Sequence, residues 1–125
     1  MNWFSSLGTG YVLGKYAMTL ITHGLAGELR DDGIACNTLW PRTAIATAAV
    51  KNVLGGDAAM AGSRKDTIMA DSAHVVLTSK ASETTDNFFL DDEVLISNGM
   101  NITDLKKYLP DPSLADSALV QDFMC

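Results

Sequence analysis

The segment from about residue 10 to residue 30 limits the possible folds of this chain more than any other feature. Its residues are apolar or small on almost every side of a helix, and Lys15 is the only charged residue before Glu28. A helix that is apolar nearly all round is buried on more than one side. We therefore predict a helix over 10–30 that lies between a sheet on one face and a partner on another.

A short apolar run at residues 34–40, with the sequence IACNTLW, follows this helix and is typical of a buried strand. A helix that leads directly into such a strand forms the second half of a βαβ unit, which normally belongs to a parallel sheet. Beyond Pro41 the pattern predicts two helices and two short strands, at 44–54, 63–80, 84–92 and 93–99. This order describes half of an α/β sheet.

The length and composition favour one globular domain. The chain has 125 residues, of which 47% are hydrophobic and 19% are charged, so it can form a core. We predict a single partial domain over residues 1–125. Its core is expected at about 8–98, followed by an irregular C-terminal tail at 99–125.

Charge and apolar runs argue against several classes of function. The net charge is −6, and no basic stripe exists that could bind nucleic acid. No run of about 18 apolar residues is uninterrupted, so we expect no membrane span. The opening MNWFSSLGTG lacks the basic and apolar regions of a signal peptide, which predicts a cytoplasmic protein. Cys36 and Cys125 suggest no disulfide framework, and Cys36 is expected as a buried small residue.

Tyr11 and Lys15 lie four residues apart near the start of the predicted helix. Positions i and i+4 share a helix face, so the two side chains point together. An ammonium group beside a phenol favours the phenolate, and such a pair can act as a general acid/base. On this spacing alone a core tyrosine with a lysine at the edge of the helix is the favoured interpretation, and catalysis is the alternative.

Several motifs in a fixed order resemble the C-terminal half of the short-chain dehydrogenases/reductases. They are YVLGK, then GIACNTLWP, then RTAIATAA. More narrowly, YVLGKYAMTL, NTLWPRTAIATAAV and NVLGG resemble the hydroxysteroid dehydrogenase-like (type 2) branch of that family. The resemblance runs from about Trp3 to Asp92. It implies an α/β fold, namely the C-terminal half of a Rossmann-type doubly wound parallel sheet.

The resemblance also implies roles for particular residues. Tyr11 is implied as the proton donor and acceptor, and Lys15 as the group that binds the nicotinamide ribose and strengthens Tyr11 as an acid. The segment from Pro41 to Thr47 is implied to line the nicotinamide of NAD or NADP, with Ile45 and Thr47 as the main contacts. The activity expected is hydride transfer between the nicotinamide and a carbonyl or alcohol substrate. The alanine-rich helix that follows is implied as part of a mobile lid, which hints at an apolar substrate.

This chain departs from the family pattern at two places. Pro41-Arg42 stands where the family has Pro-Gly, and LDDE stands where it has DGG near the last strand. The hydroxyl residue that commonly lies five places after the proline falls one place later here, at Thr47. Thr43 is the alternative, so the cofactor contacts in this loop are left open between the two threonines.

The Gly-rich turn that binds the cofactor's pyrophosphate is missing from the sequence. Gly8-Thr9-Gly10 has neither a preceding strand nor the third glycine. A member of this family is about twice as long, so we expect a truncated chain or fragment whose own binding of NAD(P) is weak or absent. We also expect homo-oligomers through the helix 10–30. The alternative to an enzyme is a non-catalytic fragment that only oligomerises or docks on a relative.

Other chemically active residues have simpler interpretations. His23 and His74 are expected as ordinary helix residues, the first with a satisfied or partner-facing ring. The acidic run of Asp91, Asp92 and Glu93 is expected to be a solvated turn rather than a metal site. We therefore predict no metal ligand in this chain.

Overall fold

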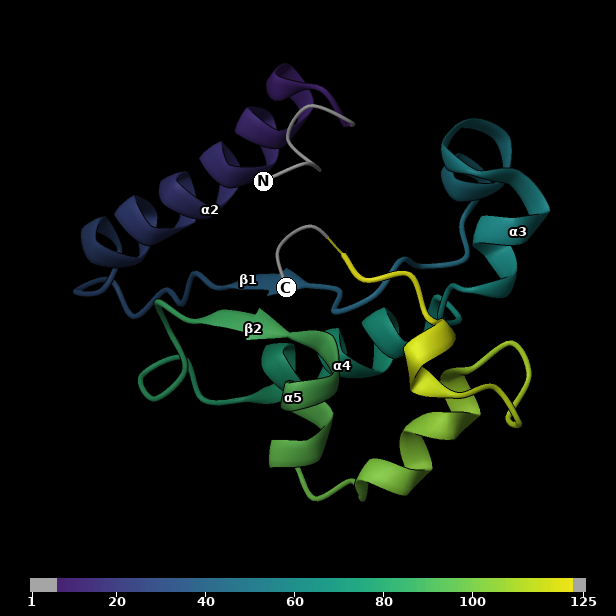
Figure 1. The fold of residues 1–125 in the computed structure, drawn as a ribbon. Coiled ribbons are helices and arrows are strands. Elements are labelled where there is room, and N and C mark those ends of the chain that lie inside the picture. The colour runs from purple at the N-terminus through teal and green to yellow at the C-terminus, as the bar shows by residue number, and fades with distance from the viewer. Residues whose placement is uncertain (1–6, 123–125) are drawn as a thin grey trace. The chain divides into compact units, whose positions relative to one another are not determined.

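The computed structural model describes residues 7–122 and has an α/β architecture (Figure 1). Its elements, in chain order, are α2 (Thr9–Glu28), β1 (Thr38–Trp40), the π-helix η1 (Val50–Leu54), α3 (Gly56–Ala61), α4 (Thr67–Thr78), β2 (Phe88–Leu90), α5 (Asp91–Ser97) and the 3₁₀ helices η2 (Ile102–Tyr108) and η3 (Asp116–Ala118). The α/β class predicted from the sequence is confirmed.

The chain divides into two compact units. The first unit holds the described residues up to Leu39 together with Ser79–Phe89, and therefore contains α2. The second unit holds Trp40–Thr78 and the described residues from Leu90 onward, which include α3, α4 and α5. The expected single partial domain stays a prediction.

Helix α2 forms where the sequence predicts it, although it ends at Glu28 and turns follow. Its buried residues are Val12, Thr19 and Ala26, which recur every seventh position and form one narrow stripe. Leu13 and Leu20, which directly follow two of these residues and lie about a third of a turn from the stripe, are exposed. Burial on more than one side is therefore wrong for this chain, because the unit supplies little besides the strand region and residues 79–89 to cover the helix.

Strands β1 and β2 pair in parallel as a two-stranded sheet. The backbone N–H of Thr38 donates to the carbonyl of Asn87 over 2.9 Å. The strand is shorter than the predicted 34–40. Before it, the N–H of Asp86 donates to the carbonyl of Cys36 over 2.8 Å, and side chains also bond the backbone. The side-chain oxygen of Asn37 accepts from the backbone N–H of Asn87, and the hydroxyl of Thr85 accepts from the N–H of Cys36. Cys36 is partly buried rather than fully buried.

The helix predicted over 44–54 begins later than expected. Residues 42–46 are extended and pair with distant segments, so tertiary hydrogen bonds override the helix preference of the alanines here. The hydroxyl of Thr47 then accepts from the N–H of Val50, and a short helical stretch with η1 follows. The predicted stop is confirmed, since η1 ends at Leu54 with Gly55 as its C-cap, and a separate helix, α3, begins at Gly56.

The strand predicted over 93–99 is wrong, because these residues belong mostly to α5. The acidic residues of its first turn favour a helix N-terminus, and the Asp91 side chain accepts from the N–H of Asp92 over 2.8 Å. The helix predicted over 63–80 is confirmed as α4, and His74 lies in it.

The core of the second unit joins α4, α5 and η2. It is formed by the buried residues Ile68, Leu95, Leu105 and Tyr108. Two of the four belong to the region expected as an irregular tail, and Leu109 and Leu119 of that region are buried as well. Within the described residues, no helix has both the length and the apolar character needed to cross a membrane.

Candidate active site

Tyr11 and Lys15 lie on one face of the first turns of α2 in the first unit. The Nζ atom of Lys15 is 5.6 Å from the centroid of the Tyr11 ring, which is within the range of a cation–π contact. The Tyr11 side chain is 49% exposed, so it is not a core residue of this chain. The i, i+4 geometry expected from the sequence is present, and the tyrosine is half exposed.

His23 joins α2 to the segment before β2. Its Nδ1 atom lies 2.6 Å from Oδ1 of Asp86, and both residues belong to the first unit. Asp86 has a φ of 64°, a left-handed conformation that is uncommon for a residue other than glycine. The expectation of a satisfied histidine is confirmed, and the contact links the helix that carries Tyr11 to the sheet region.

The residues expected to contact the cofactor follow β1 in the second unit. Pro41 and Ile45 are partly buried, Thr43 is 1% exposed, and Thr47 is exposed. The Thr43 hydroxyl donates to the carbonyl of Ala44 over 3.4 Å. Of the two hydroxyl residues left open by the sequence, only Thr47 is accessible to a ligand.

The backbone of this loop is held by two other segments. One is the C-terminal strap, which we define as residues Leu119–Asp122. The N–H of Ala44 donates to the carbonyl of Val120 over 2.8 Å. The other partner is the backbone of Arg64. Its N–H donates to the carbonyl of Ala44, and its carbonyl accepts from the N–H of Ala46. The loop therefore has a defined conformation although it is neither helix nor regular strand.

A cluster of charged side chains fixes the start of the same loop. Nε of Arg42 lies 2.7 Å from Oδ2 of Asp92, and Nη1 of Arg64 lies 3.1 Å from the same oxygen. Arg42 also donates to Glu93. Asp91 and Asp92 are 0% and 5% exposed, so the predicted solvated turn is wrong for both. Two buried carboxylates are tolerated here because two guanidinium groups accompany them.

Asp91 binds backbone rather than arginine as its main partner. Its Oδ1 atom accepts from the N–H of Arg42 over 3.0 Å and from the N–H of Asp92. Burial raises the pKa of Asp91 above its ordinary value, although these two hydrogen bonds oppose the shift. Among the described residues, Oδ2 of Asp91 and Nε of Arg64 are buried without a hydrogen-bond partner.

Sequence reasoning missed this cluster, yet a signal for it was present. The two departures from the family pattern, Pro41-Arg42 and LDDE, contact each other in the structure. An arginine in place of a glycine and extra carboxylates in place of two glycines are together consistent with one ion-pair cluster. Each departure considered alone gave no such indication.

Replacement of Asp91 by asparagine tests the electrostatics of the cluster. Because the folded-state pKa is raised, the folded chain holds this proton more tightly than the unfolded chain. The stability contributed by Asp91 therefore falls as the pH rises from the ordinary value of 3.8 through the raised value. Asparagine keeps the accepting oxygen and does not ionise, so Asp91→Asn should gain stability relative to the parent across this window, measured by urea unfolding.

The matched variant Asp91→Ala loses both accepted hydrogen bonds. It should be less stable than Asp91→Asn by about 1–3 kcal/mol at every pH. A difference between parent and Asp91→Asn that stays constant from about pH 4 to about pH 7 would contradict the raised pKa.

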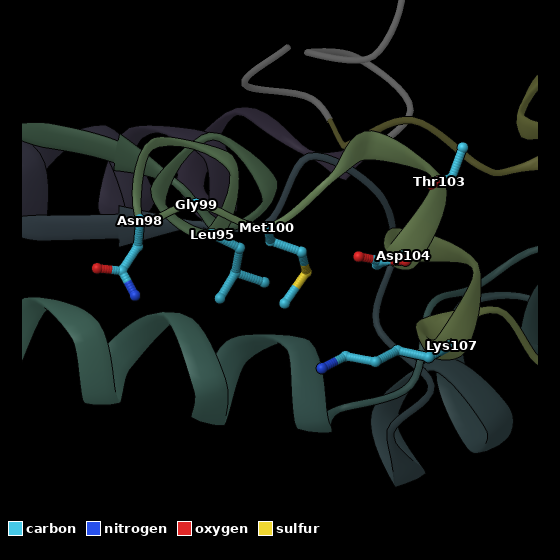
Figure 2. A pocket seen from close by; sticks show the side chains of 7 residues that line it. All are labelled: Leu95, Asn98, Gly99, Met100, Thr103, Asp104 and Lys107. Carbon is cyan, nitrogen blue, oxygen red and sulfur yellow. The ribbon is translucent and has the colours of Figure 1, made fainter.

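Figure 2 shows an open pocket in the second unit, at α5 and η2. It is lined by Leu95, Asn98, Gly99, Met100, Thr103, Asp104 and Lys107. Its lysine, Lys107, already pairs with Asp71 at 3.5 Å, and its apolar residues Leu95 and Met100 belong to or pack on the core. The pocket contains none of the expected site residues. In the described part of the chain, no group of three His, Cys, Asp or Glu could hold a metal ion.

Comparison with solved structures defines the class of protein. A putative dehydrogenase from Xanthomonas campestris matches 94% of this chain with a TM-score of 0.80 and 47% identity, and the match covers 40% of that protein. A short chain dehydrogenase from Mycobacterium thermoresistibile matches 90% of this chain with a TM-score of 0.75 and 52% identity, over 38% of its own length. The chain belongs to the short-chain dehydrogenases, as the sequence motifs predict, and it has part of their fold.

Within that family, the curated relatives are hydroxysteroid dehydrogenase-like protein 2. The protein from Xenopus laevis is 41% identical over 110 residues, which are 88% of this chain and 25% of the relative. The protein from Homo sapiens is 33% identical over 121 residues, which are 97% of this chain and 28% of the relative. The chain thus spans about a quarter of these relatives. No protein-family model matches it.

Proposed function

We propose that this chain carries the proton-transfer part of an NAD(P)-dependent oxidoreductase that interconverts a carbonyl and an alcohol. The observation that supports this best is the Tyr11–Lys15 pair. A half-exposed tyrosine lies on the same helix face as a lysine, with 5.6 Å between the ring centroid and Nζ, in a chain whose relatives are dehydrogenases. Such a pair suits a reaction in which an oxygen gains or loses a proton.

In this proposal the chemistry divides between the protein and its cofactor. A bound nicotinamide supplies or accepts the hydride. During reduction the Tyr11 hydroxyl donates its proton to the substrate oxygen while the carbonyl carbon gains the hydride, and the product is an alcohol. The Lys15 ammonium stabilises the negative charge that Tyr11 then carries. Oxidation reverses both transfers.

We expect Pro41, Ile45 and Thr47 to contact the nicotinamide end of the cofactor. Thr47 offers an exposed hydroxyl in the second unit, and Ile45 and Pro41 offer apolar surface beside it in the sequence. For Lys15 we keep the role that the family resemblance implies, a donor for the ribose. The sequence has no Gly-rich turn for the pyrophosphate, so we expect weak binding. Val53 and Leu54 of η1 are exposed, which favours an apolar substrate.

Titration of the purified chain with NADH and NADPH tests the proposal. Cofactor fluorescence should change with saturation and with a dissociation constant of about 1 mM. Lys15→Met should weaken this binding further, whereas Lys51→Met, which removes an exposed lysine of the second unit, should not. No saturable change at millimolar concentrations of either cofactor would contradict the proposal for this chain.

The exposed side of α2 favours a second candidate function, that of an oligomerisation or docking module. Leu13, Leu20 and Ile21 lie on α2 outside its buried stripe, and all three are exposed. A contiguous apolar patch of this kind is typical of an interaction surface. We propose that the patch mediates association between copies of the chain.

Ile21→Lys should shift the chain toward the monomer in sedimentation velocity at a fixed concentration, because a charge would be desolvated at the interface. Leu77→Lys serves as the matched control, since Leu77 of α4 is equally apolar and 83% exposed. Equal effects of the two substitutions, or a parent chain that is already monomeric, would contradict this second candidate.

A further inference from the structure

The C-terminal strap lies between two segments of the second unit. The carbonyl of Val120 accepts from the N–H of Ala44, and the N–H of Val120 donates to the carbonyl of Gly62, each over 2.8 Å. The N–H of Asp122 donates to the carbonyl of Arg42 over 2.9 Å. Val120 therefore connects two segments. One is the loop of residues 42–46, part of the segment expected to contact the cofactor, which we call the expected cofactor loop. The other is Gly62, the residue that follows α3.

The strap also packs closely at this point. A Cβ atom added to Gly62 would lie 3.0 Å from Cγ2 of Val120 and 3.2 Å from the carbonyl oxygen of Ala118. Leu119 is buried and anchors the strap in the core region. Gly62 has no side chain, so the strap can approach its backbone closely. The distance between residues 42–46 and the end of α3 is therefore set by backbone contacts.

We infer that the C-terminal strap is a positioning segment for the expected cofactor loop. It holds residues 42–46 through backbone hydrogen bonds and ties them to the end of α3, so that the loop keeps its conformation without forming a helix or sheet of its own. The catalytic meaning of this inference rests on the proposed function, but the structural role does not.

The physical reason is the number of backbone groups that the strap satisfies. Residues 42–46 have no regular secondary structure, so their N–H and C=O groups need partners from other segments. Arg42 and Ala44 each have a backbone bond to the strap. A cofactor contact that moves by about 1 Å can cost about a hundredfold in rate, so a loosened loop affects function strongly.

Two adjacent proline substitutions test the inference. Val120→Pro removes the N–H that donates to Gly62, while the φ of −75° and ψ of 140° at Leu119 suit a residue before proline. Gln121→Pro is the matched control, since the amide of Gln121 makes none of the hydrogen bonds described above. The two variants stiffen the chain alike and differ in the bond they remove.

Amide hydrogen exchange at Ala46 and the dissociation constant for NADH are the two measurements. The N–H of Ala46 bonds Arg64 rather than the strap, so it reports on the conformation of the loop as a whole. Val120→Pro should raise its exchange rate about fivefold or more and weaken NADH binding about as much, and Gln121→Pro should do neither.

Equal exchange at Ala46 in both variants would overturn the inference. If exchange rises but the parent binds no NADH, the proposed function fails and the strap's structural role stands.

A second pair of variants covers the case in which Val120→Pro does not fold. Gly62→Ala adds a methyl group against Cγ2 of Val120, and should raise exchange at Ala46 about threefold. Val120→Ala removes that Cγ2 atom and should restore part of the protection in the double variant, because the contact with the carbonyl oxygen of Ala118 remains. Failure of the second substitution to rescue the first would overturn the inference.

Discussion

Replacement of Tyr11 by phenylalanine is expected to lower the rate of NADH-dependent ketone reduction by about 10²–10⁴-fold. The substitution removes the only atom by which the ring can exchange a proton, and general acid/base catalysis contributes about this much to enzymatic rates. The fold should not change, because the ring is half exposed and keeps its shape. Loss of NADH absorbance with an apolar ketone measures the rate, and circular dichroism measures the helix content.

Tyr16→Phe is the matched control, since Tyr16 is a second tyrosine of the same helix. It should leave the rate within about twofold of the parent, because its hydroxyl does not lie on the Lys15 face at i, i+4 spacing. If Tyr11→Phe and Tyr16→Phe have the same rate as the parent, Tyr11 is not the proton donor.

Asp92→Asn is expected to cost about 3–5 kcal/mol of folding free energy, the typical cost of breaking a buried ion pair by removing one partner. The Asp92 carboxylate contacts Nε of Arg42 with both oxygens and Nη1 of Arg64 with one. Arg64 is 5% exposed, so its charge would stay buried without its nearest carboxylate. Urea unfolding followed by circular dichroism measures the loss.

Glu93→Gln provides the comparison for this effect. Glu93 binds the same arginine, Arg42, but its side chain is 63% exposed, so water replaces the lost contact. Its cost should stay below about 1 kcal/mol. Similar losses for Asp92→Asn and Glu93→Gln would mean that burial does not determine the strength of this cluster.

Local patterns predicted much of the fold. Helices α2 and α4 and the strand end at Trp40 follow from apolar periodicity and from the breaks after them, and β2 lies inside the strand predicted over 84–92. Helix α5 did not, because its residues Val94, Leu95 and Ile96 resemble a strand when considered alone. The acidic residues of the first turn favour a helix. Their effect depends on the burial of their side chains and on their partners in other segments, which the local sequence does not show.

The candidate site was predictable only where it is local. Tyr11 and Lys15 are one turn apart, so sequence spacing was sufficient to place them on one face. The conformation of residues 42–46 was not predictable, because it depends on partners 18 or more residues away in the chain, at Arg64, at Asp91 and in the C-terminal strap. Alanine content favours a helix there, and the pairing with these distant segments outweighs it.

The parallel pairing of β1 with β2 has a consequence for how the chain folds. Thr38 and Asn87 are 49 residues apart, and the first unit is complete only when they meet. Most of the intervening residues belong to the second unit, so early folding of α4 and its neighbours would shorten the loop that this pairing must close. The first unit should therefore form late and slowly, and it cannot be released intact as one continuous peptide.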